Sequence, residues 1–328
     1  MTYLKKALKE GDIYQNPVPT KMKVPFLKLI GKMINGKEER VPKVAPGPFH
    51  TDLSVYNTPP VSGLRVTWIG HSSLLIEIDG KRILTDPVWG DRASFVSFAG
   101  PKRFFAPPFP LEQLPVLDAI ILSHDHYDHL DKPSIKRLVG LSTPIYCSLG
   151  VGKHLIKWGI AASRITEMDW TDKVMVGADL SITALPARHF SGRGLRRNRT
   201  LWSSFVIKGH THNIFFGADS GWFPGFKDIG DVYGPFDLTM LEIGAYHEYW
   251  ANIHMGPERA SEAQVALGSK LLLPIHWGTF NLALHAWTEP VERIIEYAKQ
   301  KNFQLVLPTP GQPTEINGAA HNSEWWKK

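Results

Sequence analysis

The stretch Ser123-His124-Asp125-His126-Tyr127-Asp128-His129-Leu130-Asp131 decides what kind of protein this chain forms. It follows an apolar run over residues 117–123, which is typical of a strand buried on both faces. Within six positions the loop offers four side chains that commonly bind metal ions: His124, His126, Asp128 and His129. Such a density at a strand end predicts a metal site rather than a chance cluster of solvated residues.

The four side chains of this loop could serve two metal ions. They do not fill two coordination spheres, so further ligands must come from other strand ends. His189, Asp219 and His276 each follow a predicted strand. A carboxylate has two oxygens and can bridge two cations, so Asp219 is the natural shared ligand.

The remaining pattern predicts a layered α/β fold. Strands are expected over residues 64–69, 73–78, 82–85, 117–123, 144–147, 180–185, 203–208, 213–217, 238–243 and 271–274. Helices are expected over residues 25–35, 133–139, 149–158, 257–267 and 290–298. Hairpin-joined strands in each half, with helices between later strands, predict a four-layer αββα sandwich of two mixed sheets flanked by helices.

Charge and proline content separate a Pro-rich, basic N-terminal arm, residues 1–62, from a catalytic domain, residues 63–328. Residues 1–45 hold ten Lys and Arg and four acids, a difference of 10 − 4 = 6 that equals the formal charge of the whole chain, +6. The remaining chain is balanced, so we expect no nucleic-acid partner. The sequence leaves the oligomeric state open.

The arm contains a segment, residues 25–35, whose apolar Phe26, Leu27 and Ile30 alternate with Lys28 and Lys32. Two interpretations stay open: this helix packs on its own domain, or it lies on an anionic membrane surface together with Lys23. We see neither an export signal nor a run of ~18 apolar residues. The sequence therefore predicts a cytoplasmic protein, peripheral at the inner membrane face if the helix binds lipid.

The HxHxDH stretch with the later His, Asp and His resembles the metallo-β-lactamase superfamily over about residues 64–280. Segments 100–103 (GPKR), 217–221 (GADSG), 234–237 (GPFD), 243–246 (IGAY) and 275–280 (IHWGTF) resemble the N-acylphosphatidylethanolamine-hydrolysing phospholipase D branch. The resemblance implies one zinc ion held by His124, His126 and His189, a second held by Asp128, His129 and His276, and Asp219 as the bridge. Mn²⁺ or Fe²⁺ are alternatives, because N and O ligands alone do not select the metal.

The resemblance also implies a reaction, hydrolysis of a phosphodiester by a hydroxide that bridges the two metal ions. N-acylphosphatidylethanolamine-like lipids or other phosphodiesters are the implied substrates. Asp128 would orient the hydroxide or take its proton. Superfamily members with redox chemistry typically carry a carboxylate where His126 stands, which favours hydrolysis. The rival interpretations are a lactonase or β-lactamase-like hydrolase of small molecules and a non-catalytic metal-binding scaffold.

Several residues outside the ligand set are predicted to serve the same site. Arg193 and Arg196 belong to an arginine-rich loop after His189 and are expected to contact an anionic substrate; a solvated loop with a partly structural role is the alternative. In the resembled family a histidine at the place of His254 faces the substrate, which implies that His254 donates to a phosphoryl oxygen or protonates the leaving group; a residue that only begins a helix is the alternative. Tyr246 supplies aromatic contact surface. A further pair, His71 and Asp86, lies in turns after the first strands, where hydrogen bonds from these side chains would orient the metal ligands.

Overall fold

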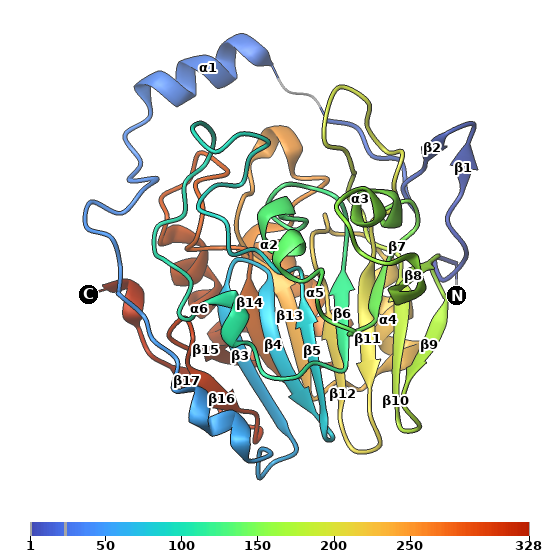
Figure 1. Ribbon diagram of the computed structural model, residues 1–328. Helices are drawn as coiled ribbons and strands as arrows, with labels where there is room; N and C mark the ends of the chain where they lie inside the picture. The colour runs from blue at the N-terminus through green and yellow to red at the C-terminus, as the bar shows by residue number, and fades with distance from the viewer. Residues whose placement is uncertain (1, 23–24, 328) are drawn as a thin grey trace.

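The computed structural model describes residues 2–22 and 25–327 (Figure 1). Lys23 lies outside the described residues. In helix α1 (Phe26–Asn35) the same holds for the side chains of Phe26, Leu27, Ile30, Met33 and Ile34. The apolar side of the predicted lipid-binding helix therefore falls outside the described part of the chain.

Two mixed sheets form the centre of the molecule. The first has the strand order β16-β3-β4-β5-β6-β7-β8. Its strands are β3 (Leu64–Gly70), β4 (Ser73–Ile78), β5 (Lys81–Thr85), β6 (Ala119–Leu122), β7 (Ile145–Ser148), β8 (Ile165–Met168) and β16 (Pro313–Glu315).

The second sheet has the order β17-β15-β14-β13-β12-β11-β10-β9. Its strands are β9 (Lys173–Val176), β10 (Leu180–Leu185), β11 (Ser204–Lys208), β12 (Asn213–Phe216), β13 (Leu238–Glu242), β14 (Leu271–Ile275), β15 (Gln304–Leu307) and β17 (His321–Asn322). A small hairpin of β1 (Lys9–Glu10) and β2 (Ile13–Tyr14) lies outside both sheets.

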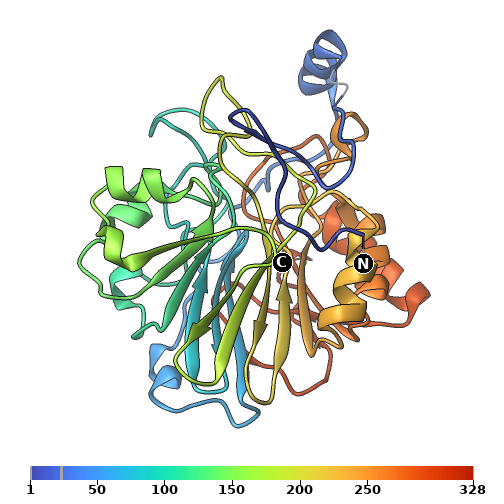
Figure 2. The ribbon, with the colours of Figure 1, turned by 90° about the vertical axis from the view of Figure 1, so that its right-hand side faces the viewer.

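Helices cover both outer faces, as Figure 2 shows. On the first sheet lie α2 (Lys132–Arg137) and α3 (Gly152–Lys157), and on the second lie α4 (Gly225–Tyr233), α5 (Gly256–Ala266) and α6 (Glu289–Lys301). This arrangement confirms the predicted αββα sandwich.

Strand β4 shows why both faces of the first sheet are buried. Its side chains alternate, so Leu74 and Ile76 enter the core between the sheets, while Leu75 packs beneath α2 and α3 with Leu84 and Ile120. A strand with two buried faces reads as a nearly continuous apolar run, which is the pattern seen in the sequence.

The direction of the strands places the loops that carry the candidate site residues. Strands β3, β5 and β6 run in one direction, because β4 is antiparallel to both β3 and β5, and β6 is parallel to β5. In the second sheet β10, β12, β13 and β14 share a direction in the same way. The two sets of carboxyl ends meet at one end of the sandwich, because His124 Nε2, after β6, lies 3.9 Å from Asp219 Oδ2, after β12.

Residues before the first sheet pack on the sandwich at several points. Tyr14 of β2 is buried with Trp170 and Trp202, and the Asn16 side chain donates a hydrogen bond to the carbonyl of His189, 2.7 Å away. Helix α1 stands apart from the sheets in Figures 1 and 2. Across residues 2–22 and 25–327, the structure contains no helix with the length and apolar content needed to cross a bilayer.

Candidate metal centre and active site

Seven chain segments place side chains at this end of the sandwich. His71, Asp86 and His124 follow β3, β5 and β6. His189, Asp219 and His276 follow β10, β12 and β14, and Glu242 is the last residue of β13.

A first group of four residues comes from two places: the start of the loop after β6, residues 124–131, which we call the metal loop, and the loops that follow strands of the second sheet. The His126 Nδ1 atom lies 2.9 Å from His124 Nε2 and 3.2 Å from His189 Nε2. The Asp219 Oδ2 atom lies 3.6 Å from His189 Nε2 and 3.9 Å from His124 Nε2. The four ligand atoms are all within 4.8 Å of one another, which is the spacing of donors around one ion.

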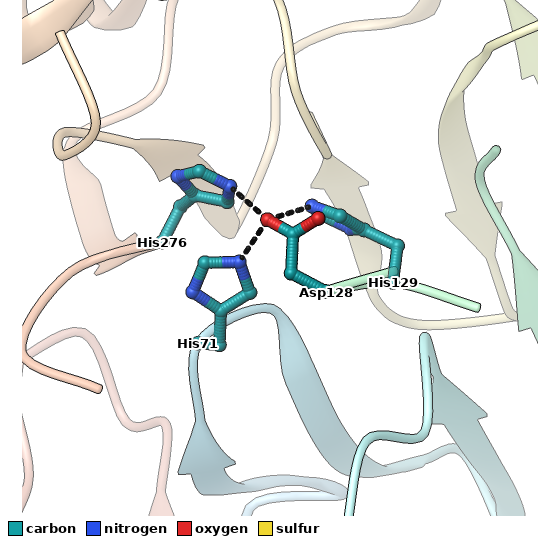
Figure 3. A group of neighbouring side chains, drawn as sticks. All are labelled: His71, Asp128, His129 and His276. Atoms are coloured by element: carbon teal, nitrogen blue, oxygen red, sulfur yellow. Dashed lines mark hydrogen bonds and ion pairs between the residues drawn. The ribbon is translucent and has the colours of Figure 1, made fainter. Parts of the chain in front are cut away.

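A second group is drawn in Figure 3, where three imidazole rings point toward the carboxylate of Asp128. Its Oδ2 atom lies 2.9 Å from His71 Nε2, 3.3 Å from His276 Nε2 and 3.6 Å from His129 Nε2. His71, predicted only to orient ligands, thus offers a nitrogen to this group itself.

Asp219 contacts both groups. Its Oδ1 atom lies 3.1 Å from His129 Nε2, and its Oδ2 atom lies 3.1 Å from His276 Nε2 in addition to its contacts with the first group. The structure therefore brings all seven residues of the predicted ligand set together, with Asp219 in the shared position.

The chemistry of these donors fits metal ions. His129 Nε2, His276 Nε2 and Asp219 Oδ1 are buried and have no hydrogen-bond partner within the described part of the chain. Buried polar atoms without partners cost free energy, and a cation that binds their lone pairs removes that cost.

The imidazoles of the site fall into two classes. Burial opposes protonation of His129 and His276, but the carboxylates of Asp219 and Asp128 outweigh it and raise the pKa of both, that of His276 to about 10. Burial lowers the pKa of His124 and of His189 well below the usual value, so both imidazoles are neutral, which is their metal-binding form. Burial opposes ionisation of Asp219, but His129 and His276 outweigh it and hold the pKa of its carboxyl well below the usual range. The site therefore holds an ionised carboxylate among imidazoles.

Hydrogen bonds behind the ligands fix which ring nitrogen faces the site. His129 Nδ1 lies 2.8 Å from Asp86 Oδ2, and His189 Nδ1 donates to the Ile253 carbonyl, 2.9 Å away. In both rings Nε2 is left to face the other donors. Asp86 itself accepts from the backbone N–H of Ser123, so it also positions the metal loop.

Backbone strain is concentrated in this region. His71, Asp86 and His276 have φ values of 54°, 35° and 62°, a conformation that favours glycine. Such residues cost about 1–3 kcal/mol each and persist only where the surroundings enforce them. The tight turns after three strands are thus formed by the ligands and their supporting residues themselves.

Glu242 was not predicted from the sequence. It is fully buried, and its Oε2 atom lies 2.5 Å from His254 Nδ1. Its Oε1 atom accepts from the backbone N–H groups of Ser220 and Met255. Burial raises the pKa of its carboxyl, although His254 opposes the shift. The only sequence signal was an acid at the end of an apolar strand.

A cavity of about 770 Å³ opens onto the two ligand groups. Apolar and aromatic side chains form much of its wall: Met22, Phe95, Tyr127, Phe190, Trp250, Ile253 and Leu282. Its polar side chains are His126, Asp128, Asp219, His254 and His276 together with Arg193 and Arg197.

Two predicted substrate contacts lie elsewhere. Arg196 is exposed and does not line the cavity, whereas its neighbour Arg197 does. The Tyr246 hydroxyl donates to Glu289, and the ring stacks on His285 outside the cavity wall. The sequence could not distinguish Arg196 from Arg197, because both lie in a loop without regular structure.

Comparison with known proteins agrees with this geometry. A family model described as a beta-lactamase superfamily domain matches residues 81–277. An uncharacterized protein of Mycobacterium tuberculosis is 48% identical over 270 residues, which cover 81% of this chain and 72% of that protein. An N-acyl-phosphatidylethanolamine-hydrolyzing phospholipase D of Caenorhabditis elegans is 40% identical over 248 residues, which cover 72% of this chain and 70% of that enzyme.

The fold is also shared with solved structures. An isothiocyanate hydrolase from Delia radicum gut bacteria superposes with a TM-score of 0.63 at 22% identity, covering 77% of this chain and 99% of that one. Fold, ligand groups and relatives agree. This chain belongs to the metallo-β-lactamase superfamily of metal-dependent hydrolases, in the branch that includes the N-acylphosphatidylethanolamine-hydrolysing phospholipases D.

Proposed function

We propose that this protein is a phosphodiesterase of the phospholipase D type, with N-acylphosphatidylethanolamine-like lipids or related phosphodiesters as substrates and two Zn²⁺ ions as cofactors. One observation carries the proposal: two ligand groups, both in contact with Asp219, lie under a cavity with an apolar wall and the cavity-lining Arg197. The apolar wall suits a lipid chain, and the guanidinium of Arg197 suits a phosphodiester anion.

Two bound metal ions would supply an activated water and stabilise negative charge on the attacking and leaving oxygens. The chain supplies the positioning. Asp128 contacts His71, His129 and His276 through Oδ2, and we assign to its other oxygen, Oδ1, the orientation of the attacking water and acceptance of its proton.

His254 is assigned the second proton transfer. Glu242 holds its Nδ1 atom, so Nε2 is the ring nitrogen available to the cavity that His254 lines. From Nε2 the imidazole would protonate the leaving-group oxygen. A buried carboxylate behind the ring also stabilises the charged imidazole before it gives up the proton.

The test of this proposal is a substrate panel on protein whose metal content has been measured. The panel consists of bis-p-nitrophenyl phosphate, an N-acylphosphatidylethanolamine, a lactone and the β-lactam nitrocefin. We expect the highest kcat/KM with a phosphodiester. A higher value with the lactone or nitrocefin would favour a small-molecule hydrolase, and no turnover of any substrate would favour a metal-binding scaffold.

Replacing Arg197 with glutamine should raise KM for phosphodiesters while changing kcat little. The guanidinium lies 5.0 Å from the centre of the Phe190 ring and lines the cavity, and a charge-assisted hydrogen bond is worth about 1.5–3 kcal/mol. The rise should be larger at low ionic strength. Arg196→Gln is the matched control. Equal KM effects of the two variants, or an equal effect on a neutral lactone, would contradict an anion contact at Arg197.

We further propose that the protein is cytoplasmic and contacts anionic membranes through α1. Lys28 and Lys32 are exposed, and Lys32 lies 2.8 Å from Glu248, two residues from the cavity-lining Trp250. Phe98, in the loop that contributes Phe95 to the cavity wall, is 81% exposed. Basic residues near a membrane surface contribute about 1 kcal/mol each.

Replacing Phe26, Leu27 and Ile30 with serine should therefore reduce sedimentation with phosphatidylglycerol vesicles and leave hydrolysis of a soluble diester unchanged. Deletion of the whole arm is unsuitable, because Asn16 supports His189 and Met22 lines the cavity. The matched control replaces the exposed Val41 and Val44 of the same arm with serine. Equal sedimentation of wild type and the triple variant would contradict lipid binding by α1.

A further inference from the structure

The arginine-rich loop is bonded directly to the metal loop, residues 124–131. The Arg193 Nη1 group donates to the carbonyl of Asp125, 2.9 Å away, and to the carbonyl of Leu130, 2.6 Å away. These two carbonyls flank the segment that carries His126, Asp128 and His129. Both hydrogens of one nitrogen are thus used to hold the two ends of this segment together.

Aromatic stacking fixes the same guanidinium from the side. Its carbon lies 4.0 Å from the centre of the Tyr127 ring and 5.1 Å from that of Trp158. A guanidinium that is stacked on rings and bonded to two carbonyls has lost most of its freedom, so it can hold the loop rigidly.

Two further hydrogen bonds, one donated by each loop, join the metal loop to the arginine-rich loop. The Tyr127 hydroxyl donates to the Arg193 carbonyl, 2.6 Å away, and the Gly192 N–H donates to Asp125 Oδ1, 2.7 Å away. The other oxygen of Asp125 lies 3.2 Å from His154 Nε2 in α3. Because His189 is only four residues before Arg193, these contacts tie the ligands of the metal loop to a ligand from the other sheet.

We propose that Arg193 is a positioning residue for the metal loop, which sets the affinity for metal by holding His126, Asp128 and His129 in register with His189. This assignment differs from the substrate contact that the sequence predicts for Arg193. It depends on the metal centre alone and is independent of the proposed phosphodiesterase activity.

The test compares zinc affinity, measured by competition with a chromogenic chelator, for wild type, Arg193→Ala, Arg193→Lys, Tyr127→Phe and the control Arg196→Ala. Loss of residues that orient ligands typically weakens metal binding about 10–100-fold. We expect such a loss for both Arg193 variants, because a lysine ammonium keeps the charge but lacks the planar fork that stacks on Tyr127. Tyr127→Phe, which loses one hydrogen bond, should weaken zinc binding by less than about tenfold.

Two further readouts separate positioning from other roles. Melting temperatures of the metal-free proteins report any general loss of stability, and KM and kcat are measured at saturating zinc. We expect weakened zinc binding with KM unchanged. If Arg193→Ala does not fold, Arg193→Lys and Tyr127→Phe still decide the matter. Three results would overturn the proposal. They are wild-type zinc affinity in both Arg193→Lys and Tyr127→Phe, a loss of zinc affinity in Arg196→Ala equal to that in the Arg193 variants, or a raised KM with unchanged zinc affinity in the Arg193 variants.

Discussion

Asp219→Asn is expected to lower kcat by at least about 10³-fold while the protein remains folded. Asp219 contacts both ligand groups: its Oδ1 atom lies near His129, and its Oδ2 atom lies near His276 of the same group and near His189 of the other. A neutral amide offers one oxygen and no charge, so it holds two cations poorly. Loss of about 4 kcal/mol of transition-state stabilisation corresponds to this factor.

Steady-state kinetics with bis-p-nitrophenyl phosphate checks the effect, and circular dichroism checks the fold. The control is Asp237→Asn, an exposed aspartate just before β13, at the opposite end of that strand from the site. A kcat for Asp219→Asn within about tenfold of wild type would show that the shared position has been assigned to the wrong residue.

His254→Ala is expected to lower kcat by about 10²-fold and to leave KM nearly unchanged, because removal of one proton donor affects the transition state more than substrate binding. Glu242→Gln should lower kcat less, since the amide can still hydrogen-bond to Nδ1 but no longer carries a charge to stabilise the imidazolium. The comparison isolates the contribution of the buried carboxylate.

A substrate with a leaving group that needs no proton provides the check on this role. For p-nitrophenolate the His254→Ala effect should shrink, whereas for an alkoxide leaving group it should persist. Equal losses with both leaving groups would indicate that His254 supports the candidate ligands and is no proton donor. The centre of its ring lies 5.0 Å from that of His189 and 5.2 Å from that of His276.

Much of the fold was predictable because its strands are buried on both faces. The bounds of β4 and β10 were predicted to the residue, and their side chains are buried throughout. Strands β8 and β9 were missed, because each lies at the edge of its sheet and they expose Thr166, Glu167, Lys173 and Met175. A strand with mixed exposure and polar residues lacks the apolar run on which the prediction depended.

Helix α4 was missed for a different reason. It contains Gly225 and Gly230, which disfavour helix formation in isolation. A Cβ atom at Gly230 would lie 2.4 Å from the Ala266 carbonyl oxygen at the end of α5, so the glycine permits close packing of the two helices. Tertiary contact therefore overrides local propensity here.

Some residues of the candidate site were predictable from the sequence, and others depend on tertiary contacts. The juxtaposition of the seven candidate ligands was predictable because each follows an apolar strand and belongs to a metal-binding residue type. The roles of Glu242 and Arg193 were not, because they depend on tertiary contacts. Glu242 contacts His254 in the segment that follows its own strand, and Arg193 contacts the carbonyls of Asp125 and Leu130 in the loop of the other sheet. Spacing along the chain does not encode such contacts.

Elemental analysis of gently purified protein tests the central claim, a dinuclear metal centre, most directly. The two ligand groups joined at Asp219 predict about two transition-metal ions per chain, and full loading after addition of zinc or manganese to depleted protein. A reproducible content of one ion or none, not raised by added zinc or manganese, would contradict the account.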